Sequence, residues 1–184
     1  MAKCTWGYFC AIFLVALCCG LRSNEVVHLK VGDLDWERHT LRVNQGKAGA
    51  DRLVYLTPEV ETSLRAWLTE RVSCNDHVFC SRRSRQRPDQ PMSNRQLRVL
   101  IKQWLRRAEI DPRKYSFHTL RHTFATELIN AGISLRCLQE LLGHKSLREV
   151  LIYAQLYEST KRQEFYRAMA AIEPLPQPVI VGGK

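Results

Sequence analysis

The second half of the chain is divided into helices by residues that start and end them, and this pattern restricts the fold strongly. A serine followed three positions later by glutamine or glutamate occurs at 93–96 and 146–149, the capping-box pattern that satisfies free amides in a helix's first turn. Gly132 and Gly143 stand where glycines commonly end helices. These signals predict a helix after Ser93, helices over 118–131 and 135–142, a helical turn reaching Tyr153, and a last helix over 160–172.

The first half combines further helices with one pair of strands. Residues 40–44 and 52–56 are short β-type runs, and the linker between them contains two glycines, so the sequence predicts an antiparallel hairpin. Ser23 is predicted to cap a short helix, and a threonine–proline pair opens a helix over about 57–69. The expected fold class is mainly α with a small antiparallel β-sheet (α+β).

The apolar run at 10–19 has two interpretations. It follows the basic Lys3, as in a signal peptide, and the small residues near Cys18 resemble a lipid-attachment site, although Leu17 is large for one. The run is short for a membrane span. Because it leads directly into Gly20 and the residues after it, a buried core helix ending at Gly20 is favoured over a secreted or lipid-anchored protein.

The charge of the chain points to a polyanionic partner. The 184 residues carry a formal net charge of +10, which favours nucleic acid over an anionic membrane. A hydrophobic content of 45% argues against disorder and permits one domain with a real core. A basic protein unrelated to nucleic acid would have the same charge, so charge alone does not decide the function.

The seven cysteines are odd in number and irregularly spaced, which favours a reducing cytoplasm over a disulfide framework. Cys74-x-x-His77-x-x-Cys80 offers three zinc ligands, whereas structural zinc takes four. A loop leading into a short strand is the preferred interpretation there, and we expect no metal and no cofactor.

Four side chains between 118 and 153 have the chemistry needed to handle a phosphodiester. Arg121 offers a planar fork of donors for two phosphate oxygens, and His118 and His144 can hydrogen-bond phosphate or move a proton. Tyr153 is an oxygen nucleophile able to form a covalent intermediate. Each residue also has an ordinary structural explanation when it is taken alone.

Five short motifs carry a family resemblance: Gly20-Leu21-Arg22-x-x-Glu25, Gly46-Lys47, His118-x-x-Arg121-His122-x-Phe124-Ala125-Thr126, Leu142-Gly143-His144 and Ile152-Tyr153. In order and spacing they resemble the tyrosine recombinases, or phage integrases, from about residue 14 to 172. The resemblance implies that family's catalytic-domain fold, which is mostly helical with a small antiparallel sheet whose hairpin carries a lysine.

The resemblance also implies a role for each matching residue. Arg22 and Arg121 would bind the non-bridging oxygens of the scissile phosphate, and Tyr153 would attack phosphorus to give a 3′-phosphotyrosyl link. Lys47 would protonate the departing 5′ oxygen. The family often has a second lysine near Ala50, which is absent from this hairpin.

The remaining roles concern proton transfer and support. His118 would assist proton transfer, His144 would donate to a non-bridging oxygen, and Glu25 would orient its neighbours. No metal is required in this chemistry because arginines supply the positive charge. We expect further contacts to DNA from five basic residues: Arg82, Arg83, Arg85, Arg95 and Lys145.

The resemblance implies a domain organisation and an assembly. We expect a catalytic domain over 1–172 and a proline-rich tail over 173–184, with the family's separate N-terminal DNA-binding domain absent because about twenty residues precede Arg22. The expected partner is double-stranded DNA, with weak self-association alone and a homo-tetramer on DNA. The alternative is a decayed, non-catalytic DNA-binding relative.

Overall fold

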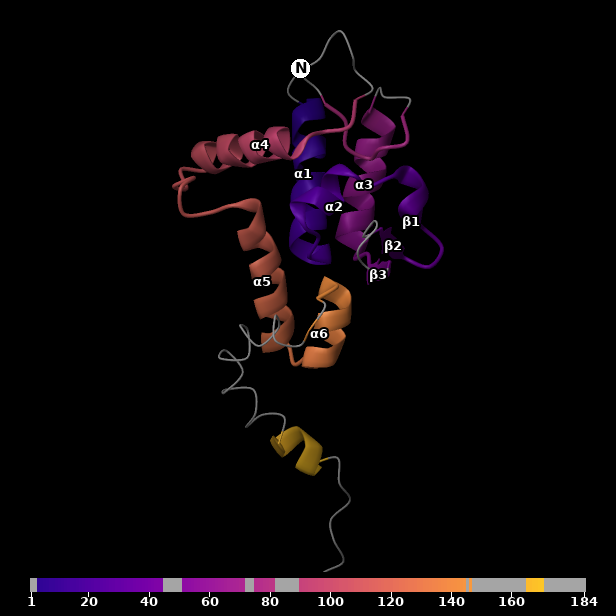
Figure 1. The fold of residues 1–184 in the computed structure, drawn as a ribbon, viewed down its shortest axis with the longest axis vertical. Helices are drawn as coiled ribbons and strands as arrows, with labels where there is room; N and C mark the ends of the chain where they lie inside the picture. The colour runs from indigo at the N-terminus through magenta and orange to yellow at the C-terminus, as the bar shows by residue number, and fades with distance from the viewer. Residues whose placement is uncertain are drawn as a thin grey trace, which may run out of the picture.

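The computed structural model describes residues 3–44, 51–71, 75–81, 90–144, 146 and 165–170, although not the side chains of 3–6. This part of the chain is mainly helical with one small sheet, as expected (Figure 1). Its helices are α1 (Lys3–Cys19), α2 (Ser23–Val27), a 3-10 helix (Val31–Asp33), α3 (Pro58–Glu70), α4 (Asn94–Arg107), α5 (Phe117–Asn130), α6 (Leu135–Leu142) and a helical stretch over 165–170.

The sheet consists of antiparallel strands in the order β1 (Leu34–Asp35), β2 (Thr40–Val43) and β3 (Arg52–Tyr55). Strands β2 and β3 confirm the predicted pair, and the turn at 45–50 lies outside the described residues. Side chains alternate along β3, so that Arg52 and Val54 are buried while Leu53 and Tyr55 are exposed. A buried arginine on this face requires partners inside the molecule.

Helix α1 forms the centre of the main core. It packs against α2, α3 and α5, and its residues Ala11, Ile12 and Val15 are completely buried (Figure 1). The apolar run is therefore a core helix, as favoured from the sequence. Among the described helices, none is both long and apolar enough to cross a membrane.

Gly20 ends α1 and sets the direction of the chain into α2. Its φ of +61° lies in the left-handed region that favours glycine. A Cβ at this position would lie 2.4 Å from Cδ1 of Phe124 on α5. This close approach brings the loop after α1 against the α5 helix.

Helices α5 and α6 pack side by side and extend away from the α1–α3 body (Figure 1). They share a smaller core of Ala125, Ile129, Leu138 and Leu142. The bounds predicted for α6 are confirmed, and Gly143 adopts the left-handed conformation that ends the helix. The signal at 93–96 likewise stands at the start of α4, and α5 begins one residue before the predicted 118.

The prediction that Ser23 caps α2 is wrong. Arg22 is the residue before the first turn, and its backbone N–H donates to Oε2 of Glu25 at 2.7 Å. The carboxylate three positions into the helix does the work that a serine oxygen would otherwise do. The cap consequently places Arg22 and Glu25 in direct contact.

The proposed zinc ligands lie only partly within the described residues. Cys74 is outside them, and His77 and Cys80 form isolated bridges with Lys30 and Pro91. No cluster of three metal-binding side chains occurs among the residues that the structure describes.

Candidate active site

Arg22 lies between α1 and α2 and reaches α6. Its Nη1 donates to Oε1 of Glu25 at 3.0 Å, and its Nη2 donates to the carbonyl of Gly143 at 3.2 Å. The Arg22 side chain is 37% exposed, so its charge faces solvent at the surface of the site. The contact with Gly143 joins the first and fourth motifs of the sequence.

Arg121 is a buried arginine on α5, with only 2% of its side chain exposed. Its Nη1 donates to the carbonyl of Gly20 and its Nη2 to the carbonyl of Leu142, both at 2.7 Å. Nη1 also lies 4.0 Å from Oε2 of Glu25. Arg121 thus ties the loop that carries Arg22 to the end of α6.

Arg52 is not among the predicted site residues, yet its guanidinium binds both carboxylate oxygens of Glu25. Its Nη1 and Nη2 donate to the two carboxylate oxygens at 2.8 and 2.9 Å, and its Nε donates to the carbonyl of Leu141 at 2.7 Å. Alternation on β3 could have revealed it, because a cation at an inward strand position requires a buried partner.

Three guanidinium groups therefore surround one carboxylate. Burial by itself raises the pKa of Glu25, but the hydrogen bond and charge of Arg52, followed by the backbone and charge of Arg22, outweigh it and lower that pKa. Glu25 is thus ionised at neutral pH, and the cluster of Arg22, Arg52 and Arg121 retains excess positive charge. The planar, forked donors of such a cluster attract an anion.

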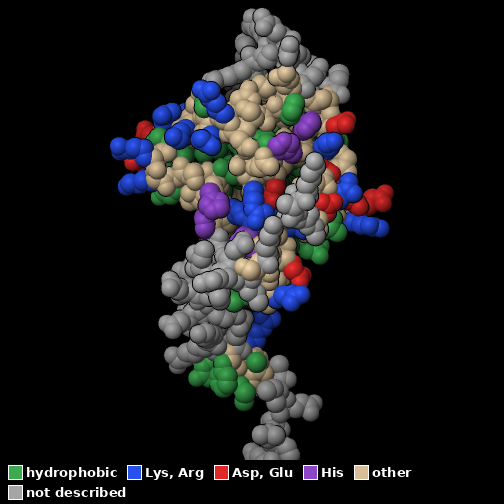
Figure 2. Space-filling model, viewed as in Figure 1, with side chains coloured by type: hydrophobic (Ala, Val, Ile, Leu, Met, Phe, Trp, Pro, Cys, Tyr) green, Lys and Arg blue, Asp and Glu red, His purple; other side chains and the backbone are tan. Residues whose placement is uncertain are grey.

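His118 lies at the start of α5, beside His122, with the two ring centroids 4.5 Å apart. Partial burial lowers the pKa of His118 first, and the charges of His122, Arg121 and Arg22 lower it further. His118 is therefore neutral at pH 7 and can accept a proton or a hydrogen bond. Figure 2 shows histidine, basic and acidic side chains gathered where α5 meets the main body.

His144 follows the left-handed Gly143 at the end of α6. Its backbone N–H donates to the carbonyl of Gln139 at 3.1 Å, and its own carbonyl accepts from the Gln139 side chain at 3.2 Å. Because Arg22 and Arg121 bind the carbonyls of the two preceding residues, His144 is held at the edge of the cluster.

The predicted residues divide into three groups. Arg22, Glu25, His118, Arg121 and His144 are brought together from three separate segments of the chain. Six others lie outside the described residues: Lys47, Arg82, Arg83, Arg85, Lys145 and Tyr153. The remaining one, Arg95, lies on α4, and the roles of all twelve stay predictions.

Basic side chains also cover α4 (Figure 2). The predicted Arg95 is exposed in its first turn. A recess of about 380 Å³ between α4 and the start of α5 is lined by Arg98, Lys102, Arg113 and His118, among others. The sequence motifs did not identify Arg98 and Lys102, although both lie on the polar side of the amphipathic α4, nor Arg113 in the loop that follows it.

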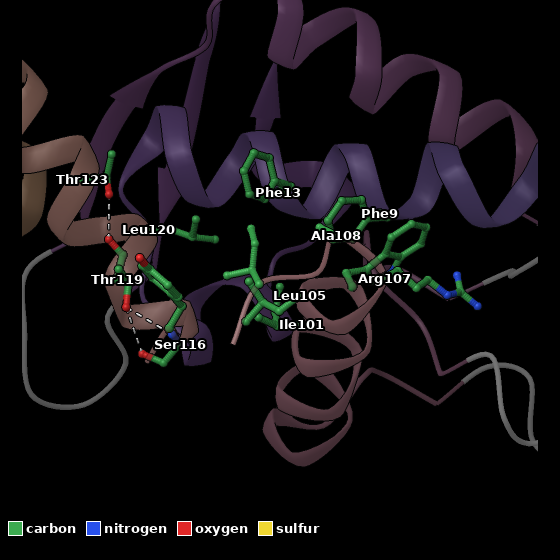
Figure 3. Close-up of a pocket in the computed structure, with 13 residues that line it drawn as sticks. Phe9, Phe13, Ile101, Leu105, Arg107, Ala108, Ser116, Thr119, Leu120 and Thr123 are labelled. Atoms are coloured by element: carbon green, nitrogen blue, oxygen red, sulfur yellow. Dashed lines mark hydrogen bonds between the residues drawn. The ribbon is translucent and has the colours of Figure 1, made fainter. Parts of the chain in front are cut away.

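A larger groove of about 670 Å³ is apolar and unsuited to phosphate. Phe9 and Phe13 of α1, Ile101 and Leu105 of α4 and Leu120 of α5 face into it (Figure 3). The arginine cluster lies elsewhere and provides the charged donors that an oxyanion requires.

Comparisons with known proteins identify the family and the fold of this chain. Residues 7–160 match the sequence model of the phage integrase family. Tyrosine recombinase XerA of Pyrococcus furiosus is 33% identical over 149 residues, which cover 81% of this chain and 50% of that protein. The chain therefore spans about half the length of the curated relatives it matches.

Two solved structures have similar folds. A crystal structure of XerA recombinase has a TM-score of 0.74 and 30% identity, and the match covers 88% of this chain and 58% of that one. A post-cleavage complex of XerH site-specific recombinase with a palindromic difH substrate has a TM-score of 0.71 and 28% identity, covering 94% and 48%.

Proposed function

This chain belongs to the phage integrase family, and we propose that it is a site-specific recombinase that cleaves and rejoins double-stranded DNA through a 3′-phosphotyrosyl intermediate. The observation that carries the proposal is the cluster of Arg22, Arg52 and Arg121 around Glu25, beside His118 and His144. It provides an excess of positive charge and forked donors where a phosphate would approach.

The arginines would stabilise the negative charge that develops on the non-bridging phosphate oxygens. Arg22 has a partly exposed side chain and would bind a non-bridging oxygen directly. Arg121 would contribute charge and donors from its buried position on α5. His144 would donate to a non-bridging oxygen from the end of α6. Their fixed positions reduce the reorganisation needed when the pentacoordinate state forms.

The covalent step would exchange one phosphoester for another. The Tyr153 oxygen attacks phosphorus, the bond from phosphorus to the 5′ oxygen breaks, and Lys47 gives that oxygen a proton. His118, which is neutral at pH 7, assists by accepting the proton of the tyrosine hydroxyl. Since the phosphotyrosine retains the energy of the broken bond, a 5′-hydroxyl can reverse the attack without ATP.

A covalent adduct tests this function. The protein is incubated with a library of nicked duplexes of randomised sequence, and adducts that survive denaturation are isolated. We expect adducts in the presence of EDTA, because the arginines supply the charge that a metal ion supplies elsewhere. Tyr153→Phe should abolish the adduct, whereas Tyr55→Phe, which alters an exposed tyrosine on β3, should not.

The second candidate is a DNA-binding relative without catalysis, and the net charge of +10 with the basic side chains of α4 supports it as well as it supports a recombinase. It predicts salt-dependent binding of duplex DNA with no adduct on any member of the library. An adduct that persists in Tyr153→Phe would instead refute the assignment of the nucleophile.

We also propose that the protein acts in the cytoplasm and assembles as a homo-tetramer on DNA. Phe165, Tyr166 and Met169 are 59%, 59% and 50% exposed, which leaves an apolar helical surface available to a second copy. Sedimentation with and without DNA tests this assembly. Met169→Ser should weaken it, and Leu53→Ser, which alters an exposed apolar residue on β3, should not.

A further inference from the structure

Arg52 joins three parts of the candidate active site, and nothing in the sequence motifs assigns it a role. It is the first residue of β3, directly after the 45–51 linker that contains Lys47. Its side chain is 7% exposed and points inward to α2 and α6. It binds both carboxylate oxygens of Glu25 and the backbone of Leu141.

The geometry of these bonds depends on a guanidinium. A carboxylate receives two parallel bonds from Nη1 and Nη2, while Nε donates to the Leu141 carbonyl from the same rigid plane. A lysine ammonium has three donors at one point and cannot make both the forked pair and the third bond in this arrangement.

Each partner of Arg52 in turn holds a residue that faces the phosphate site. Glu25 binds both the backbone and the guanidinium of Arg22, and Leu141 lies immediately before the residues whose carbonyls bind Arg121 and Arg22. Fixing Glu25 therefore fixes Arg22, and fixing the Leu141 carbonyl fixes the segment that ends in His144.

We propose that Arg52 is a positioning residue. It fixes Glu25 and the end of α6 relative to each other, and so aligns Arg22 and His144 on the phosphate. This inference rests on the proposed function for its catalytic consequence, but not for its structural one. Arg52 contacts the supporting carboxylate and backbone, and Arg22 and His144 make the contacts to the phosphate.

Hydrogen exchange provides a test that does not depend on catalysis. In Arg52→Gln we expect faster exchange of the Gly143 and His144 amides, which donate to Glu140 and Gln139 at the end of α6, with no change in α4. Arg136→Gln is the matched control, because it breaks an exposed ion pair to Glu140 on the same helix. Equal protection in wild type and Arg52→Gln, or equal loss in the control, would overturn the proposal.

The adduct assay measures the catalytic consequence. At saturating DNA, we expect Arg52→Gln to form the adduct about 100-fold more slowly, with DNA affinity changed less than threefold, since small misplacements of aligned groups cost rate on this scale. Arg52→Lys should restore thermal stability but not the rate. If Arg52→Lys restored both the stability and the rate, a positive charge without the forked geometry would suffice, and the positioning role would be overturned.

A companion variant covers the case in which Arg52→Gln does not fold. Arg52→Gln combined with Glu25→Gln removes the carboxylate that would otherwise lose its main partner, and this double variant should fold. Its exchange at Gly143 and His144 should still be fast, and wild-type protection there would count against Arg52. Absence of any adduct from the wild type would refute the proposed function, while exchange would still decide the role of Arg52.

Discussion

Substituting alanine for Gly20 perturbs both the backbone and the packing next to Arg121. The φ of +61° would be strained for alanine, and the new Cβ would lie 2.4 and 2.6 Å from Cδ1 and Cε1 of Phe124. Carbon atoms in contact normally stand about 3.5–4.0 Å apart, so the ring or helix α5 would have to move.

Two separate costs determine how far Gly20→Ala lowers the free energy of unfolding. The left-handed backbone costs roughly 1–2 kcal/mol for a residue with a Cβ, and overpacking a filled site costs roughly 1–3 kcal/mol. Gly20→Ala should therefore lower the free energy of unfolding by about 2–5 kcal/mol. Small domains are stable by about 5–15 kcal/mol, so the loss is readily measured.

Two other glycines separate these costs in urea denaturation experiments. Gly132 has a φ of +87° but nothing within 4 Å of a new Cβ, so Gly132→Ala should cost only the backbone term of about 1–2 kcal/mol. Gly32 has neither feature, and Gly32→Ala should change stability by less than about 0.5 kcal/mol. If Gly20→Ala costs no more than Gly132→Ala, the argument from close packing is wrong.

The same change should impair the site. The Gly20 carbonyl accepts from Nη1 of Arg121 at 2.7 Å, so a shift of α5 relative to this loop would strain that bond. Adding Phe124→Ala to Gly20→Ala removes the ring that the new Cβ meets. The double variant should lose less stability than the sum of the two single variants, and strict additivity would contradict the contact.

Three further predictions concern titration and a buried hydroxyl. The pKa of Glu25 is lowered in the folded state, so the ionised carboxylate stabilises the fold fully above its unfolded pKa of about 4.3, and this stabilisation is lost as pH falls through the folded pKa. In urea titrations, Glu25→Gln should therefore lose less stability than the wild type when the pH is lowered, and an equal loss would count against the ionised carboxylate. Because the charge of His122 helps to lower the pKa of His118, His122→Gln should move the acid limb of the rate of adduct formation to higher pH, and an unmoved limb would count against His118 as the proton acceptor. Tyr8 donates its hydroxyl to the buried Cys80 carbonyl at 3.0 Å, so Tyr8→Phe should cost about 1–3 kcal/mol in thermal or urea unfolding, and a neutral result would mean that the carbonyl has another donor.

The helical part of the fold could be predicted where the ends of a helix are chemically marked. Ser134 and Gly143 delimit α6 because one caps its first turn and the other takes the left-handed conformation, and both properties belong to single residues. The start of α2 was misassigned because the deciding group, Glu25, reaches back to Arg22 instead of acting at its own position. Strand β1 spans two residues, which is too short for a period of two to be recognised.

The candidate site could be predicted only as far as its residues resemble family motifs. Arg22, Arg121 and His144 were found in this way, although no local pattern shows that Arg121 donates to Gly20 across 101 positions. Arg52 was missed because its partners, Glu25 and Leu141, lie 27 and 89 positions away, and only folding brings them together. The residues proposed to contact the phosphate carry the recognisable motif, whereas the residue proposed to align them is defined by burial and by long-range contacts. A buried arginine at an inward strand position, paired with a motif carboxylate, is therefore the feature to examine when a site assembled from several segments depends on exact alignment.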